Sequence, residues 1–166
     1  LANRPPMSIN TKNPRPVAVI ILAAGLGTRM KSRLPKVLHP IAGQPMIRHL
    51  LASVDKLQPD RVIVVTSADA ADVRDSVKPH LIAIQSEQLG TGHAALQTID
   101  HLTDFNGDIL ILFGGDPLVT PQTMGRLLER LRQEDNPGAV VLGFRPDDPG
   151  LYGRLIQDEQ GQLAKI

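Results

Sequence analysis

Residues 17–30 read VAVIILAAGLGTRM, an aliphatic run followed by a loop of small residues. The run at 17–22 has no polar side chain and is rich in Val and Ile, as is typical of a strand buried on both faces of a parallel sheet. Glycines at 25 and 27 let the loop turn tightly and bring bare backbone N–H groups close to a ligand. The stretch therefore predicts a strand that ends in an anion-binding loop.

Arg29 and Lys36 follow this loop before a helical pattern begins at Pro45. An arginine offers a bidentate fork to a phosphate, whereas a lysine acts as a mobile point charge. Most such side chains are simply solvated, but two cations beside one glycine-rich loop favour phosphate contacts. The loop is therefore predicted to bind a nucleoside triphosphate.

The rest of the chain alternates apolar runs with helical patterns. We expect strands at 17–22, 61–66, 81–85, 108–113 and 139–144, and helices at 45–57, 69–77, 92–102 and 121–134. This alternation predicts an α/β fold with a mainly parallel sheet and helices on both faces. Ligands of such sheets bind beyond the carboxyl ends of the strands, so the loops at 22–27, 85–91 and 113–118 should converge.

Composition excludes several classes of function. The net charge is +1, from 18 basic and 17 acidic side chains, which argues against a nucleic-acid surface. With three Phe, one Tyr and no Trp, a base-stacking platform is not expected. The chain has no cysteine for a disulfide or thiolate site, and no apolar run of the ~20 residues that span a bilayer. No membrane partner is expected.

Both ends of the chain differ from its centre. Residues 1–16 carry four prolines and no apolar period, which predicts a disordered tail. Residues 153–158 and 162–166 flank a Glu-Gln-Gly turn and predict a β-hairpin. The sequence stops inside the second strand of that hairpin, so the domain at 17–166 is expected to be incomplete at its C-terminus.

Several motifs together resemble the signature of sugar-nucleotide pyrophosphorylases. They are LAAGLGTRM at 22–30, LPKVLH at 34–39, QLGTGHA at 88–94, Phe-Gly at 113–114 and YGRLI at 152–156. Within that group the chain is most similar to the uridyltransferase domain of bacterial bifunctional N-acetylglucosamine-1-phosphate uridyltransferase / glucosamine-1-phosphate acetyltransferases. The resemblance runs from Val17 to the end.

The resemblance implies a Rossmann-like nucleotide-diphospho-sugar transferase fold. It also implies uridylyl transfer from UTP to N-acetylglucosamine-1-phosphate, giving UDP-N-acetylglucosamine and pyrophosphate with Mg²⁺ as cofactor. Such enzymes are cytoplasmic and supply precursors of peptidoglycan and lipopolysaccharide. The full-length family is trimeric through a β-helical acetyltransferase domain, which this chain lacks.

The resemblance also implies roles for individual residues. Arg29 and Lys36 are expected to contact the phosphates as catalytic cations, and Gln85, Gly90 and Thr91 to read the uracil. Gly153 is expected to contact the sugar. The remaining expected substrate-binding residues are Leu22, Ala23, Ala24, Gly25, Gly27, Thr28, Phe113 and Gly114. A plainer interpretation of the second loop is a turn before a helix with Thr91 as its N-cap.

One position departs from the family pattern. The family has Gly-Asp-x-Pro-Leu with a metal-binding aspartate, whereas this chain has Gly114-Gly115-Asp116-Pro117-Leu118. A shift of one residue in extended chain turns a side chain to the opposite face, although a bulge at the extra glycine could restore it. Asp116 is therefore either the metal ligand or a turn residue before Pro117.

Three alternatives to the uridylyl transfer stay open. One is a pyrophosphorylase for another sugar or base, against which the QLGTGHA motif argues. The second is a catalytically impaired nucleotide-binding fragment, favoured by Gly115 at the metal position. A Rossmann dehydrogenase is more distant, because Met30 replaces the third glycine of the dinucleotide fingerprint and no acidic residue follows the second strand at the required spacing.

Overall fold

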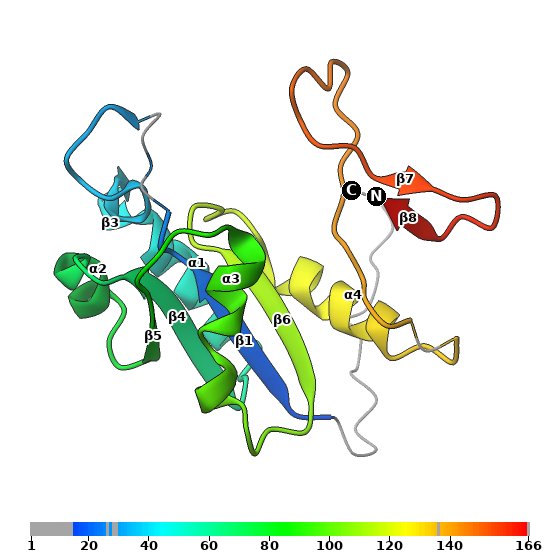
Figure 1. Cartoon of the computed structure of the whole chain (residues 1–166), viewed down its shortest axis with the longest axis horizontal. Helices are drawn as coiled ribbons and strands as arrows, with labels where there is room; N and C mark the ends of the chain where they lie inside the picture. The colour runs from blue at the N-terminus through cyan, green and yellow to red at the C-terminus, as the bar shows by residue number, and fades with distance from the viewer. Residues whose placement is uncertain (1–14, 26, 28–29, 136, 166) are drawn as a thin grey trace, which may run out of the picture. The chain divides into compact units, whose positions relative to one another are not determined.

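The computed structural model describes residues 15–25, 27, 30–135 and 137–165 (Figure 1). Residues 1–14 of the predicted tail lie outside this range, so that prediction is not tested. The chain divides into two compact units with the boundary between Leu128 and Glu129. The main sheet belongs to the first unit, and a small hairpin belongs to the second.

The first unit is built on a four-stranded sheet with the strand order β5-β4-β1-β6. The strands are β1 (Val17–Leu22), β4 (Arg61–Ser67), β5 (Leu81–Gln85) and β6 (Asp108–Phe113). All pairings are parallel, and β1 pairs with both β4 and β6, so Ile21 lies in register with Val64 and Leu112. Four of the predicted strands and their parallel arrangement are confirmed.

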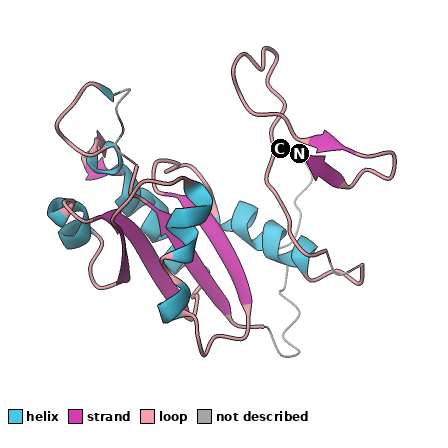
Figure 2. Ribbon diagram, in the orientation of Figure 1, coloured by secondary structure: helices cyan, strands magenta, loops and turns pink. Residues whose placement is uncertain are grey.

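Helices cover both faces of this sheet, as the alternation of patterns predicts (Figure 2). They are α1 (Met46–Asp55), α2 (Ala71–Ser76), α3 (Thr91–Leu96) and α4 (Pro121–Leu131). Successive residues of β1 point to opposite faces, so Ile21 belongs to a buried cluster with residues of α1, α2 and α4, whereas Ile20 belongs to a second cluster with Ala94 of α3. The α/β fold class is therefore confirmed.

The helix predicted at 92–102 is wrong in its second half. The α-helical part ends at Leu96, and a 3₁₀ turn, η3 (Ile99–His101), follows. The hydroxyl of Thr98, a buried side chain, donates to the carbonyl of Ala95 at 2.7 Å, and the Thr98 N–H bonds to the same carbonyl. A threonine that bonds back to the preceding turn competes with regular α-helical bonding, and the chain tightens there.

The strand predicted at 139–144 is also wrong. Those residues have no regular secondary structure, and Val141, Leu142 and Phe144 are exposed. A strand needs a neighbouring strand whose backbone forms hydrogen bonds with its N–H and C=O groups. The segment belongs to the second unit, whereas the described strands of the main sheet all belong to the first.

Two short antiparallel pairs complete the described strands. One is β2 (Pro40–Ile41) with β3 (Gln44–Pro45), and the other is β7 (Ile156–Gln157) with β8 (Leu163–Lys165). The second pair confirms the predicted C-terminal hairpin, although its strands are shorter than expected. The carboxylate of Asp158 accepts the N–H groups of Gln160 and Gln162 in its turn. Within the described part of the chain, no helix has the length and apolarity needed to cross a bilayer.

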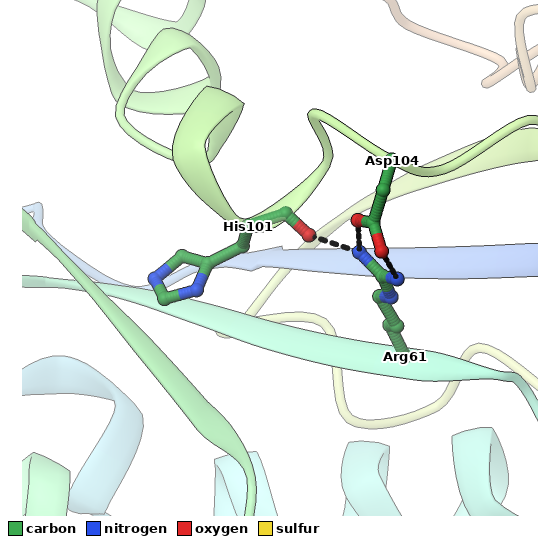
Figure 3. Close-up of polar contacts among 3 residues, drawn as sticks. All are labelled: Arg61, His101 and Asp104. Carbon is green, nitrogen blue, oxygen red and sulfur yellow. Dashed lines mark hydrogen bonds and ion pairs between the residues drawn. The ribbon is translucent and has the colours of Figure 1, made fainter.

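The 3₁₀ turn is tied to the start of β4 by Arg61 (Figure 3). Its Nη1 donates to the carbonyl of His101 at 2.6 Å, and its guanidinium makes a bidentate pair with Asp104 at 2.8 and 3.0 Å. The guanidinium also lies 5.4 Å from the ring centre of Phe105. Arg61 therefore anchors the end of the α3 segment to the end of the sheet opposite the glycine-rich loop.

This ion pair predicts a pH-dependent term in stability. The hydrogen bond from Arg61 holds the pKa of Asp104 below its ordinary value of 3.8. A lowered pKa in the folded chain gives a stabilisation that is present above the ordinary value and lost as the pH falls through the lowered one. Asp104→Asn is expected to lower the urea midpoint modestly at neutral pH, with the difference from the native chain shrinking as the pH falls below 3.8 and through the lowered pKa of Asp104.

A matched control is Asp100→Asn, which removes an exposed carboxylate one turn away. We expect it to leave the urea midpoint at neutral pH unchanged. An Asp104→Asn deficit that stayed constant from neutral to acid pH would contradict the electrostatic explanation.

Candidate functional site

The loops that follow β1, β5 and β6 are joined by hydrogen bonds at the carboxyl ends of the strands. The N–H of Gly114 donates to the carbonyl of Leu22 at 2.9 Å, and Nε2 of Gln88 donates to the carbonyl of Ala24 at 3.0 Å. The N–H of Ala23 donates to the carbonyl of Val65 on β4 at 2.8 Å. The predicted convergence of the three loops is therefore confirmed.

The glycine-rich loop is shaped to admit a close neighbour at Gly27. Its φ is +59°, and a Cβ added there would lie 2.9 Å from Cβ of Lys36. Only glycine combines this left-handed conformation with that contact. Thr28 and Arg29 lie outside the described residues, so their expected roles stay predictions. Leu22, Ala23, Ala24 and Gly25 form the described start of the loop.

Lys36 extends from this loop toward the loop after β6. It begins a 3₁₀ turn, η2 (Lys36–Leu38), and its side chain lies against Gly115. A Cβ on Gly115 would be only 2.7 Å from Nζ of Lys36. The family pattern has its aspartate at this position, so here the lysine occupies space beside a residue without a side chain. Its exposed ammonium is available to an anion at this edge of the sheet.

Gly114, the neighbouring residue, is enclosed by the core instead. A Cβ there would meet Cγ1 of Val37 at 3.2 Å, Cβ of Ala23 at 3.3 Å and the carbonyl oxygen of Leu22 at 3.3 Å. These atoms belong to a 3₁₀ turn, a loop start and a strand end, none of which moves as freely as a lysine terminus. Gly114 is the point where the predicted phosphate loops pack on each other.

The two glycines predict opposite responses to the same change. Gly114→Ala is expected to destabilise the first unit by about 1–3 kcal/mol, because a methyl group is forced into a packed site. Gly115→Ala is expected to cost much less, since only the flexible end of Lys36 must move. Urea unfolding of both variants measures the difference. Equal losses would contradict the tight packing at Gly114.

The loop after β5 carries the residues expected to read the base. Gln85 ends β5 and is only 4% exposed, and its Nε2 donates to the carbonyl of Gly90 at 3.2 Å. Gly90 has a φ of +99° and is the N-cap of α3. Thr91 is the first residue of the helix, so the alternative in which Thr91 caps it is wrong.

Three contacts in this region were not specified by the sequence. The bond from Gln88 to Ala24 joins the second loop to the first. His93 of α3 contacts Gln85 through Nδ1 at 3.1 Å and Gln97 through Nε2 at 3.2 Å. Both residues stand inside or beside the QLGTGHA motif, but the motif alone does not say which atoms meet.

Asp116 lies in an exposed turn after β6. Its N–H donates to the carbonyl of Phe113 at 3.0 Å, and its own carbonyl accepts the N–H of Val119 at 3.4 Å. Asp116 therefore takes part in a turn, as its plainer interpretation predicts, and its role as a metal ligand stays a prediction. Among the described residues, no group of three or more His, Asp and Glu side chains gathers as a metal site. Mg²⁺ often takes only one or two protein carboxylates beside substrate phosphates, so a single exposed aspartate fits such an ion.

The two remaining expected site residues in the described range are Phe113 and Gly153. Phe113 ends β6 with its side chain half-exposed. Gly153 belongs to the second unit, where neighbouring Arg154 donates to the carbonyls of Tyr152 and Gly150. The expected contact of Gly153 with a sugar stays a prediction.

Comparisons with known proteins agree with this arrangement. The family model described as "MobA-like NTP transferase domain" matches residues 19–165. The curated relative named "Bifunctional protein GlmU" from Paramagnetospirillum magneticum is 52% identical over 150 residues, which are 90% of this chain and 33% of the relative. The chain thus spans about a third of the length of the curated relatives it matches.

Solved structures give the same fold. A 4-diphosphocytidyl-2C-methyl-D-erythritol synthase from Anaerococcus prevotii superposes with a TM-score of 0.65 at 18% identity, covering 90% of this chain and 63% of that one. Rv0371c from Mycobacterium tuberculosis, solved in complex with manganese, superposes with a TM-score of 0.52 at 19% identity, covering 69% and 58%.

Proposed function

The chain belongs to the MobA-like NTP transferase domain family, and we propose that it is the nucleotide-binding part of an enzyme that makes UDP-N-acetylglucosamine. In the proposed reaction an oxygen of the N-acetylglucosamine-1-phosphate group attacks the α-phosphorus of UTP. A new P–O bond forms as the bond from the α-phosphorus to the bridging oxygen breaks, and pyrophosphate leaves. The identity to the GlmU relatives and the joined loops support this proposal.

One observation carries the proposal furthest. The ammonium of Lys36 lies over the glycine loop after β6, while that loop is bonded to the glycine-rich loop after β1. An exposed cation between two loops of small residues suits a triphosphate, whose charge grows at the leaving oxygen during transfer. Because no covalent enzyme intermediate is needed, positioning and charge neutralisation supply the rate enhancement.

The proposed roles of the other residues follow from their places. The backbone from Leu22 to Gly27 holds the nucleotide, Arg29 contacts the triphosphate, and Gln85 with Gly90 and Thr91 selects uracil. Gly153 contacts the sugar. Asp116 would hold Mg²⁺ together with the substrate phosphates, and the ion would supply further positive charge there.

The relatives suggest the wider setting. We propose a cytoplasmic enzyme that supplies peptidoglycan and lipopolysaccharide precursors, with residues 17–166 as part of its nucleotidyltransferase domain. In the intact protein, an acetyltransferase domain would hold three copies together. No nucleic-acid or membrane partner is proposed.

A second candidate is nucleotide binding without turnover. It is favoured by Gly115, which leaves no carboxylate beside Lys36 at the family's metal position. The next acid in the sequence, Asp116, stands one residue later in an exposed turn.

The test is release of pyrophosphate from UTP and N-acetylglucosamine-1-phosphate with Mg²⁺, run beside CTP, dTTP and GTP. The same assay on a Gly115→Asp, Asp116→Thr variant examines the metal position, and calorimetry measures UTP binding to both chains. Release that prefers UTP supports the proposed transfer. UTP binding without release from either chain supports the second candidate. A preference for another nucleotide overturns the assignment to uridylyl transfer.

A further inference from the structure

The side chain of Gln85 is held by one end only. It is almost fully buried, and both of its hydrogen-bonded contacts use Nε2, to the carbonyl of Gly90 at 3.2 Å and to Nδ1 of His93 at 3.1 Å. Within the described range, no donor is bonded to its Oε1. A carbonyl oxygen can only accept, so the contact with Gly90 requires the amide nitrogen at this end.

The orientation of this amide decides which base it can read. With Nε2 turned toward Gly90 and His93, Oε1 is the free end, and it can accept a hydrogen bond from the N3–H of uracil. Cytosine has a lone pair at N3, which would face that oxygen without a proton between them. A reversed amide would offer N–H groups instead and would suit cytosine at the same position.

His93 constrains the amide through its tautomer. A neutral imidazole has one accepting and one donating nitrogen, and Nδ1 must be the acceptor if Gln85 is to donate to it. Nε2 then carries the proton. On that side Nε2 of Gln97 lies 3.2 Å away, and because two N–H donors cannot bond each other, this contact is not a hydrogen bond in the proposed tautomer. The amide of Gln97 is held instead by the His93 backbone carbonyl, to which it donates at 3.0 Å. The other tautomer would turn a donor toward the amide nitrogen of Gln85 and favour the reversed orientation.

We propose that His93 is a positioning residue that fixes the amide of Gln85 and thereby sets the preference for uracil over cytosine. The inference rests on the proposed function in one respect, namely that Gln85 reads the base. His93 itself need not touch the nucleotide. Its role differs from plain packing, because packing would not depend on an acceptor at the Nδ1 position.

The test compares the affinities of UTP and CTP by calorimetry, which needs no turnover. His93→Leu removes the acceptor and is expected to lower the UTP/CTP affinity ratio about tenfold, the size of one hydrogen-bond term. His93→Asn places an amide oxygen near the position of Nδ1 and is expected to keep the native ratio. Gln97→Ala is the matched control, because it changes the other side of the ring and leaves Nδ1 in place.

Nitrogen NMR of the native chain gives a second measurement that does not depend on variants that fold. We expect an unprotonated Nδ1 and a protonated Nε2 in His93. A protonated Nδ1, or a native UTP/CTP ratio retained by His93→Leu, would overturn the inference. A native chain without any preference for UTP would instead overturn the proposed base reading by Gln85, so the two failures are distinguishable.

Discussion

Replacing Lys36 by methionine is expected to lower kcat/KM for pyrophosphate release about 100-fold, with UTP affinity reduced less, by about tenfold. Methionine keeps much of the length and apolar stem of lysine but removes the charge. The ammonium lies against Gly115, where a triphosphate held by the joined loops would develop negative charge during transfer. Its contribution should therefore be larger in the transition state than in the bound ground state. Steady-state kinetics and calorimetry separate the two effects.

Lys31→Met is the matched control, because Lys31 is an exposed lysine of the same connection and has no proposed role in binding. We expect it to keep native kinetics. If both variants lost activity equally, the loss would reflect the overall charge of the loop rather than Lys36. If Lys36→Met bound UTP and released pyrophosphate normally, the proposed phosphate role of Lys36 would be wrong.

The parallel sheet could be predicted from sequence because its strands are continuous apolar runs, although only the central strands β1 and β4 are buried on both faces, and the edge strands β5 and β6 alternate buried and exposed residues. The runs at 17–22, 81–85 and 108–113 match the observed strands, and the run at 61–66 differs by one residue at its end. A continuous apolar run bounded by polar or glycine-rich loops carries this signal without knowledge of its partners. Because parallel strands run in the same direction, the loops that follow them all lie at the carboxyl edge of the sheet, and their convergence could be predicted as well.

The run at 139–144 shows the limit of the same reasoning. Its composition is that of a buried strand, yet Leu142 is 57% exposed. Apolar composition reports which residues gain by burial, whereas a strand also needs hydrogen-bonding partners at the right place. The predicted end of the helix at Leu102 was wrong for a local reason. The side chain of Thr98 donates a hydrogen bond to the carbonyl of Ala95, and the α-helix has already ended at Leu96.

The site was predictable at the level of loops but not of atoms. Glycine spacing indicated where backbone approaches a ligand, and Gly27 and Gly114 both prove to be closely packed. The position of Lys36 over Gly115 and the contact of His93 with Gln85 depend on side-chain directions that residue spacing does not encode. The departure from the family pattern at Gly115 was visible in the sequence. The contact of the Lys36 side chain with Gly115 was not.

The largest expected effect on stability comes from the central strand. Ile21→Ala is expected to destabilise the first unit by about 2–5 kcal/mol, because Ile21 is 0% exposed and packs among residues of several elements. β1 pairs with strands on both sides, so the structure around the truncated side chain can relax little. Since Leu22 and Ala23 follow directly, the same variant is expected to weaken UTP binding as well.

Ile109→Ala provides the control within the same sheet. Ile109 lies on β6 in register with Ala18 of β1, but its side chain is 45% exposed and leaves less apolar surface to lose. Its expected cost is below about 1 kcal/mol. Urea unfolding of the two variants at equal protein concentration measures the difference. Similar losses would mean that Ile21 does not occupy a packed core between β1 and α1.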